Sequence, residues 1–103
     1  MNAQSRPKIV CLCGSTRFWQ TFQRINHQET MAGNIVLAPG CDGHRHAITV
    51  EQKKALDELH FRKIDLADEV YVININRYIG ESTKNEIVYA IKHGKPIRYL
   101  ETT

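Results

Sequence analysis

The sequence IVCLCGSTR at residues 9–17 decides the fold, because an apolar run turns within one residue into a polar turn. The apolar part belongs to a predicted strand at 8–13. Gly14 allows the backbone to turn sharply directly after this strand. An amphipathic pattern follows and predicts a helix over about 17–32. A buried strand that leads through a tight turn into a helix is typical of a parallel α/β sheet.

The rest of the chain continues this alternation of strand and helix, with no internal repeat and no linker. Such alternation predicts a parallel sheet with right-handed crossovers. We expect one domain over residues 1–103, with three helices and four strands in the order 2-1-3-4. In this order the first and third strands are neighbours, so the turns that follow them open onto one crevice. The other predicted strands are 35–38, 69–75 and 96–100, and the other predicted helices are 50–66 and 83–93.

Length, composition and charge restrict the class of protein. The chain has 103 residues, of which 42% are hydrophobic and 24% charged, as in one globular domain with a modest core. Its formal net charge of +3 is too small to indicate a nucleic acid polymer as partner. No apolar run approaches the roughly 20 residues of a membrane span, and the polar start shows no signal peptide. Cys11 and Cys13 alternate along one strand, so we expect core residues and a reducing cytoplasm.

The first turn, residues 14–17, carries groups that bind anions. Gly14 lets the backbone approach a ligand, and the hydroxyls of Ser15 and Thr16 can hydrogen-bond to it. The guanidinium of Arg17 can make a two-pronged contact with a phosphate or a carboxylate. A plain helix cap followed by a surface arginine explains the same residues, so both interpretations stay open. The turn has neither the lysine of a Walker A loop nor the later glycines of a dinucleotide fingerprint.

The second turn brings the carboxylate of Glu86 close to the hydroxyls of Ser82 and Thr83. Thr83 and Glu86 match the Thr-x-x-Glu capping box, and on the pattern alone we favour this structural role. In the alternative, the helix dipole keeps Glu86 ionised in the first helical turn, as a nucleophile requires. Ala90, one turn further along, then leaves room for a ligand. Asn74, at the end of the preceding strand, could hydrogen-bond to a sugar or a base.

Together these features resemble the nucleoside 2-deoxyribosyltransferase-like superfamily, which includes the 2′-deoxynucleoside 5′-phosphate N-hydrolases. The resemblance extends over residues 8–100 and rests on short motifs that occur in a fixed order. The motifs are a strand followed by Gly14-Ser15-Thr16-Arg17, the pair Ala67-Asp68 before a strand, a turn that contains glycine, then Glu86, Ala90 and a Lys95-Pro96-Ile97 strand.

The resemblance implies a flavodoxin-like three-layer fold. It also implies cleavage or transfer at the N-glycosidic bond of a nucleoside or nucleoside 5′-monophosphate. Glu86 matches the family nucleophile, which attacks the anomeric carbon of the sugar. The turn at 14–17 matches the motif that lines the sugar or phosphate site, and Ser82 and Thr83 fall in the turn that often holds the 5′-phosphate.

One position departs from the family pattern. Family members carry an Asp about two helical turns before the Ala-Asp pair, where it helps to handle the leaving base, and His60 occupies that position here. A histidine can act as an acid near neutral pH. His60 also lies between Leu56 and Ile64 on the apolar stripe of its helix, so a core position explains it as well. Asp57 and Asp65 are expected to point to other faces of this helix.

The departure at His60 keeps a second function open, a non-catalytic module on the same fold that binds or senses a nucleotide. We expect no cofactor and no metal. Cys41, Asp42, His44 and His46 form a compact set, but no second pair of ligands with zinc spacing accompanies them.

Three helices cannot easily cover both faces of a four-stranded sheet, so we expect a homodimer that buries one pair of helices and completes the pocket. Light scattering at micromolar concentration should therefore give twice the mass of one chain. A monomer under these conditions would contradict this expectation.

Overall fold

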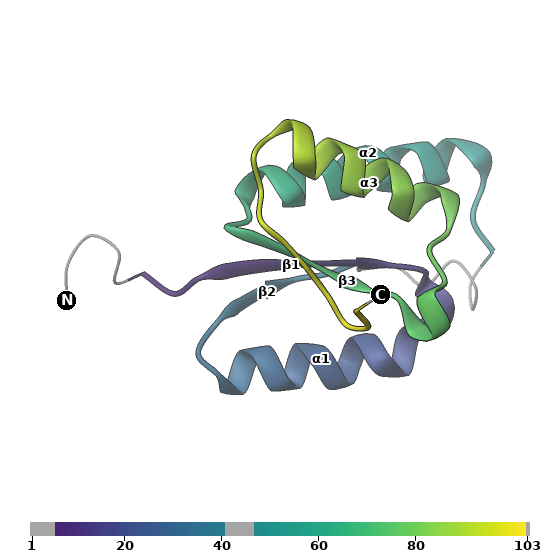
Figure 1. Cartoon of the computed structure of the whole chain (residues 1–103). Helices are drawn as coiled ribbons and strands as arrows, with labels where there is room; N and C mark the ends of the chain where they lie inside the picture. The colour runs from purple at the N-terminus through teal and green to yellow at the C-terminus, as the bar shows by residue number, and fades with distance from the viewer. Residues whose placement is uncertain (1–5, 41–46, 103) are drawn as a thin grey trace.

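The computed structural model describes residues 6–40 and 47–102, which form a three-layer α/β fold (Figure 1). The strands are β1 (Ile9–Gly14), β2 (Ile35–Leu37), β3 (Glu69–Ile73) and β4 (Ile97–Tyr99), and the α-helices are α1 (Trp19–Met31), α2 (Val50–Leu66) and α3 (Glu81–Lys92). All strand pairs are parallel, in the order β2-β1-β3-β4. Helices α2 and α3 cover one face of the sheet and α1 covers the other (Figure 1). The predicted fold class and strand order are thereby confirmed.

The central strands β1 and β3 bury both of their faces, and each face has a core of its own because successive side chains alternate. The core under α2 and α3 contains Cys11, Cys13, Ile64, Ala67, Val70, Val72 and Ala90. The core over α1 contains Val10, Leu12, Phe22, Ile25, Tyr71 and Ile73. The prediction that Cys11 and Cys13 are core residues on one face of a strand is confirmed.

Helices α2 and α3 begin differently. Thr49 caps α2 through a complete capping box, because its hydroxyl accepts from the Gln52 N–H and the Gln52 side chain accepts from the Thr49 N–H. Helix α3 begins at Glu81, two residues before the predicted start, and its N-cap, Gly80, makes no side-chain bond. Thr83 and Glu86 therefore lie inside the helix, and the capping box that we favoured for them is wrong.

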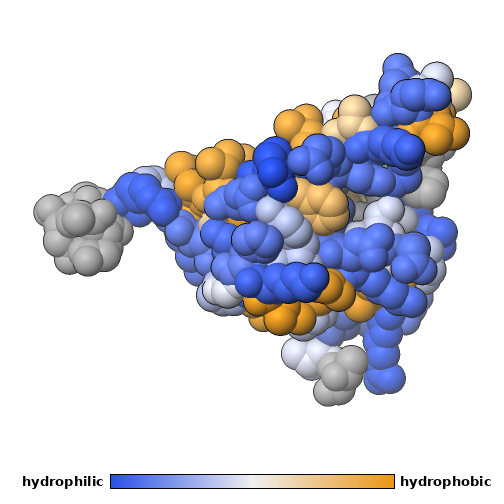
Figure 2. Space-filling view, turned by 90° about the horizontal axis from the view of Figure 1, so that it is seen from above, coloured by the Kyte–Doolittle hydropathy of each residue, from blue (hydrophilic) through white to orange (hydrophobic). Residues whose placement is uncertain are grey.

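The buried stripe of α3 also differs from the prediction. We expected Val88 and Ile91 to face inward, but they are 53% and 63% exposed. The buried positions are Thr83, Glu86 and Ala90, at the three- and four-residue spacing of one helix face. Figure 2 shows the outer side of the layer formed by α2 and α3, where apolar patches lie among mostly polar side chains. Among the described residues, no helix combines the length and apolar character needed to cross a membrane.

Asp68 ties the start of β3 to the start of β1. Its carboxylate accepts hydrogen bonds from the Ile9 N–H at 2.9 Å and from the Arg6 guanidinium at 2.8 Å. The bond from Arg6 is the largest cause that lowers the pKa of Asp68, to about 2, and the bond from Ile9 adds to it. Asp68, which belongs to one of the family-like motifs, thus has a structural role in holding two parallel strands in register.

Gly14 ends β1 at a close approach to β3. A Cβ atom there would lie 2.8 Å from the carbonyl oxygen of Ile73 and 3.1 Å from its Cβ. We expect Gly14→Ala to lower the free energy of unfolding by about 1–3 kcal/mol, because the two central strands would have to move apart. Urea denaturation followed by circular dichroism measures this loss. Gly40→Ala is the matched control, since the nearest atom to a Cβ there is 4.0 Å away. Equal losses in the two variants would contradict the prediction.

Candidate functional site

Glu86 lies at the junction of two cavities of about 270 Å³ each. Both cavities are lined by Thr16, Lys53, Asp57 and Glu86, so the two spaces adjoin. Glu86 is only 8% exposed because it belongs to the stripe of α3 that faces the sheet. A carboxylate that borders two adjoining cavities can face different parts of one ligand.

The two cavities differ in character. The first, which we call the apolar cavity, lies beside α2 and has Pro39, Ile48, Leu56 and Leu59 in its lining. The second, which we call the anion cavity, is lined by the two turns that sequence analysis singled out, residues 14–17 and 80–83. The structure therefore brings both turns to one cavity at the carboxyl edge of β1 and β3, as the strand order predicted.

Positive groups gather around the anion cavity. The Arg17 guanidinium stacks over the Tyr78 ring, 4.2 Å from its centroid. The Lys53 ammonium donates to the Ser82 hydroxyl at 3.0 Å and to the Asp57 carboxylate at 2.8 Å. Residues 81–83 form the first turn of α3, where the backbone N–H groups have no acceptor within the helix and the dipole is positive. These groups together suit a phosphate or a carboxylate.

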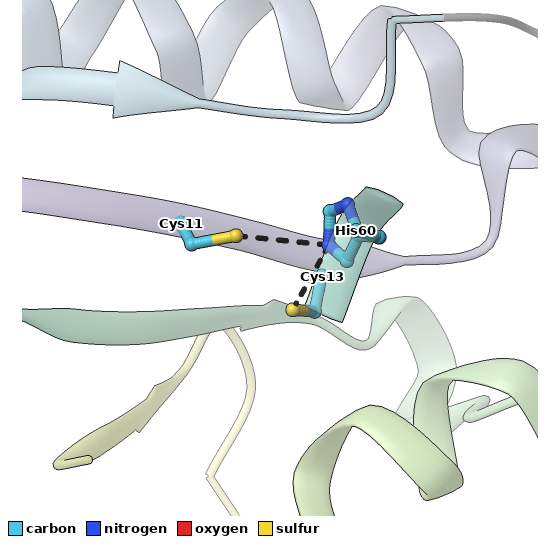
Figure 3. Close-up of side chains that lie close together, drawn as sticks. All are labelled: Cys11, Cys13 and His60. Atoms are coloured by element: carbon cyan, nitrogen blue, oxygen red, sulfur yellow. Dashed lines mark hydrogen bonds between the residues drawn. The ribbon is translucent and has the colours of Figure 1, made fainter. Parts of the chain in front are cut away.

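A compact polar cluster lies beneath Glu86. Nε2 of His60 is 3.3 Å from Sγ of Cys13 and 3.7 Å from Sγ of Cys11, and Figure 3 shows the imidazole facing both sulfur atoms. The same nitrogen is 3.9 Å from Oε1 of Glu86. Both sulfur-bearing residues are fully buried and His60 is 5% exposed. His60 thus occupies the core position on its helix and contacts the candidate nucleophile as well.

Burial shifts the proton equilibria in this cluster. Burial raises the pKa of Glu86 to about 7, although the positive charge of His60 and a hydrogen bond with the Cys13 thiol oppose the rise. Burial by itself lowers the pKa of His60, but its hydrogen bond with Cys11 and the negative charge of Glu86 outweigh burial, and the pKa is raised. With a pKa of about 7, Glu86 carries a proton part of the time near neutral pH, where a carboxylate on its own would be fully ionised.

Most of the predicted site residues meet here. Gly14, Ser15, Thr16, Arg17, Ser82, Thr83 and Glu86 line the anion cavity, and His60 lines the apolar cavity with Glu86. Ser15 also accepts a hydrogen bond from the Arg17 N–H at 3.2 Å and caps a short 3-10 helix at Thr16–Phe18. The two interpretations of the first turn are thus compatible, since the same residues cap a helix and line a cavity.

Asn74 lies apart from the other predicted residues. Its amide donates to the Glu101 carbonyl at 2.9 Å and accepts from the Glu101 N–H at 2.8 Å. Asn74 is 2% exposed and borders a separate cavity with Arg77 and Tyr99. In this structure its side chain ties the end of β3 to the segment after β4 and does not reach the cavities beside Glu86.

Lys53 and Asp57 line both cavities, and neither was predicted as a site residue. Asp57 was expected on another face of its helix, and that expectation is wrong. The signal was present, because Lys53, Asp57 and His60 are spaced by four and three residues and so share one face of α2. The compact set at Cys41, Asp42, His44 and His46 lies outside the described residues.

A comparison with protein-family models gave no match, and a comparison with curated proteins also gave none. The functional assignment therefore rests on the chemistry of the two cavities.

The raised pKa of Glu86 predicts how stability depends on pH. Its folded-state pKa of about 7 lies above the ordinary value of 4.5, so the folded protein binds the proton more tightly than the unfolded chain does. This contribution to stability is fully present below pH 4.5 and is lost as the pH rises through 7. Glu86→Gln cannot ionise, so we expect it to be more stable than the wild type by about 2 kcal/mol at pH 8.

Urea denaturation at pH 5 and pH 8 checks this expectation. The advantage of Glu86→Gln should be small at pH 5 and larger at pH 8. Glu81→Gln, on an exposed position of the same helix, is the matched control. If the difference between Glu86→Gln and the wild type is the same at both pH values, the assigned ionisation is wrong.

Proposed function

We propose that this protein cleaves or transfers the N-glycosidic bond of a nucleoside or nucleoside 5′-monophosphate, with Glu86 as the nucleophile. The observation that carries the proposal is the position of the Glu86 carboxylate, buried where an apolar cavity adjoins an anion cavity. A nucleotide has an apolar base at one end and a phosphate at the other, with the sugar between them. A ligand that places its base and phosphate in the two cavities would present its sugar to Glu86.

The anion cavity supports a 5′-phosphate as the anchoring group. Arg17 offers a planar guanidinium, and Ser82 and Thr83 lie in the first turn of α3. A phosphate there would accept hydrogen bonds from backbone N–H groups and would interact favourably with the helix dipole. Lys53, which already contacts Ser82, adds a second positive charge beside the same turn. Binding energy at the phosphate would hold the anomeric carbon in place for attack.

The chemical step uses one carboxylate oxygen. Oε of Glu86 forms a bond to the anomeric carbon while the bond from that carbon to the base nitrogen breaks. The electron pair leaves with the base, which takes up a proton from solvent, and the incoming water or second base later releases one. A water molecule, or a second base in the transfer reaction, then displaces Glu86 from the sugar, and the carboxylate is regenerated. Positive charge develops on the sugar in the transition state of each step, and the negative charge of Glu86 stabilises it.

His60 and Asp57 have different positions relative to this step. Nε2 of His60 is 3.9 Å from Glu86, and the positive charge of His60 favours the ionised carboxylate. His60 therefore supports the nucleophile as a positioning residue. Asp57 borders both cavities and carries the carboxylate that can accept hydrogen bonds from a base or from the attacking water.

The second candidate is a module that binds a nucleotide without cleaving it. Two observations favour this function: Nε2 of His60 is engaged by two thiols, and Glu86 has a pKa of about 7 and is partly protonated at neutral pH. A protonated carboxyl group is a poor nucleophile. Both candidates use the same cavities and differ only in turnover.

We further propose that the protein acts as a homodimer in the cytoplasm. Cys11 and Cys13 are free thiols, as expected in a reducing compartment. Helices α2 and α3 expose apolar side chains that a partner copy could cover, namely Leu59, Leu66, Val88 and Ile91.

The test is release of free base from a panel of deoxynucleosides and their 5′-monophosphates, measured by chromatography in buffer that contains a metal chelator. We expect turnover by the wild type and a loss of at least about 10³-fold in Glu86→Gln. Glu58→Gln, which changes an exposed acid of α2 that lines neither cavity, should retain activity. Equal turnover by Glu86→Gln and the wild type would exclude Glu86 as the nucleophile.

Thermal denaturation separates the two candidate functions. A monophosphate that raises the melting temperature without any release of base would favour the binding module. If no compound of the panel raises the melting temperature or releases free base, both candidate functions are rejected.

A further inference from the structure

We propose that Cys11, Cys13 and His60 form a zinc site. Sγ of Cys11, Sγ of Cys13 and Nε2 of His60 all lie within 4.8 Å of one another (Figure 3). Thiolate and imidazole are the ligands that zinc prefers in structural sites. The proposal concerns metal binding and does not depend on nucleotide cleavage.

The distances fit a tetrahedral ion. Zinc lies about 2.3 Å from sulfur and about 2.0–2.1 Å from nitrogen, so sulfur and nitrogen ligands at a tetrahedral angle are roughly 3.5 Å apart. The two measured distances from His60 Nε2 are 3.3 Å to Cys13 and 3.7 Å to Cys11, on either side of that value. Two edges of one face of a zinc tetrahedron therefore already have the expected length, and the third, between the two sulfur atoms, is at most 4.8 Å.

The fold holds these three donors in place. Cys11 and Cys13 are two residues apart on β1, so their side chains project from the same face of a central strand. His60 reaches the same point from α2, four residues before the fully buried Ile64. Because both elements belong to the core, the site is formed before any metal arrives, and little conformational entropy is lost on binding.

The fourth position is left to water, and an access route is present. Oε1 of Glu86 lies 3.9 Å from His60 Nε2 but does not belong to the set of donor atoms that lie within 4.8 Å of one another, so a water molecule beside this carboxylate completes the tetrahedron. The apolar cavity is lined by His60 and Glu86 and gives an ion a way in from the surface. The positive charge of Lys63 acts on both Cys11 and His60, and it partly offsets the negative charge of two thiolates and the nearby carboxylate. The site thus has ligands, geometry, charge compensation and access.

Metal binding is tested on the full chain, purified under reducing conditions, treated with a chelator and then titrated with Co²⁺ without any nucleotide. We expect one equivalent of Co²⁺ to give near-ultraviolet absorption from thiolate-to-cobalt charge transfer, and one equivalent of Zn²⁺ to abolish it. Absence of this band in the folded wild type would overturn the proposal and would leave a hydrogen-bonded thiol–imidazole cluster as the explanation.

Variants assign the site within the chain. Cys11→Ser and Cys13→Ser should each weaken Zn²⁺ binding at least tenfold, whereas Cys41→Ser, the third cysteine of the chain, is the matched control and should bind as the wild type does. Loss of binding in Cys41→Ser, with full retention in Cys11→Ser and Cys13→Ser, would place the metal elsewhere and overturn the proposal.

X-ray absorption spectroscopy of the zinc-loaded wild type requires no variant. We expect two sulfur ligands at about 2.3 Å, with the other ligands nitrogen or oxygen. A first shell without sulfur would overturn the proposal. Because base release is measured in the presence of a chelator and metal binding in the absence of nucleotide, either proposal can fail while the other stands.

Discussion

The close contact of β1 with β3 determines where the groups of the candidate site lie. Gly14 pairs with Ile73 at the carboxyl ends of these strands, and a side chain at Gly14 would collide with the Ile73 backbone. Strand β1 leads at once into the turn at 14–17, and β3 leads through a short 3-10 helix at Ile75–Arg77 to the turn at 80–83. Both turns line the anion cavity, so the close pairing at Gly14 holds them on one side of the sheet.

The same geometry places a carboxylate where its charge is costly. Glu86 faces the sheet from α3 and is almost wholly buried, which disfavours its ionised form and raises its pKa. His60 and the Cys13 thiol offset part of this cost. The site is consequently less stable than an apolar core of the same shape would be, as is common where binding or catalysis requires polar groups in a fixed arrangement.

The strands and their order could be predicted from the sequence because they depend on two simple rules, apolar periodicity and right-handed crossover. The start of α3 could not, because its N-cap is Gly80 and no side chain marks it. The Thr-x-x-Glu pattern at Thr83 was a false signal, since position in the helix and not residue type determines whether a cap forms. The separate position of Asn74 could not be predicted for another reason. Its hydrogen-bond partner, Glu101, is 27 residues away, so the sequence cannot indicate that the amide of Asn74 is already occupied.

Pairings between distant residues could not be predicted in general. Arg98 binds Glu29 at 2.8 Å and Glu69 at 2.9 Å, and no local pattern connects these three residues. The positions of Lys53 and Asp57 could have been predicted, because their spacing from His60 places all three on one helix face. That spacing was missed because periodicity was applied to apolar residues only.

The departures from an apolar pattern on α2 and α3 occur at one place. The buried stripe of α3 becomes polar at Thr83 and Glu86, and the stripe of α2 becomes polar at His60. Three polar residues on two helices would be expected to point in unrelated directions if they were incidental. Instead, all three border the adjoining cavities, and His60 also contacts the thiol of Cys13. Buried polar groups that carry a cost in stability and border the same cavities are the arrangement that supports the proposed function.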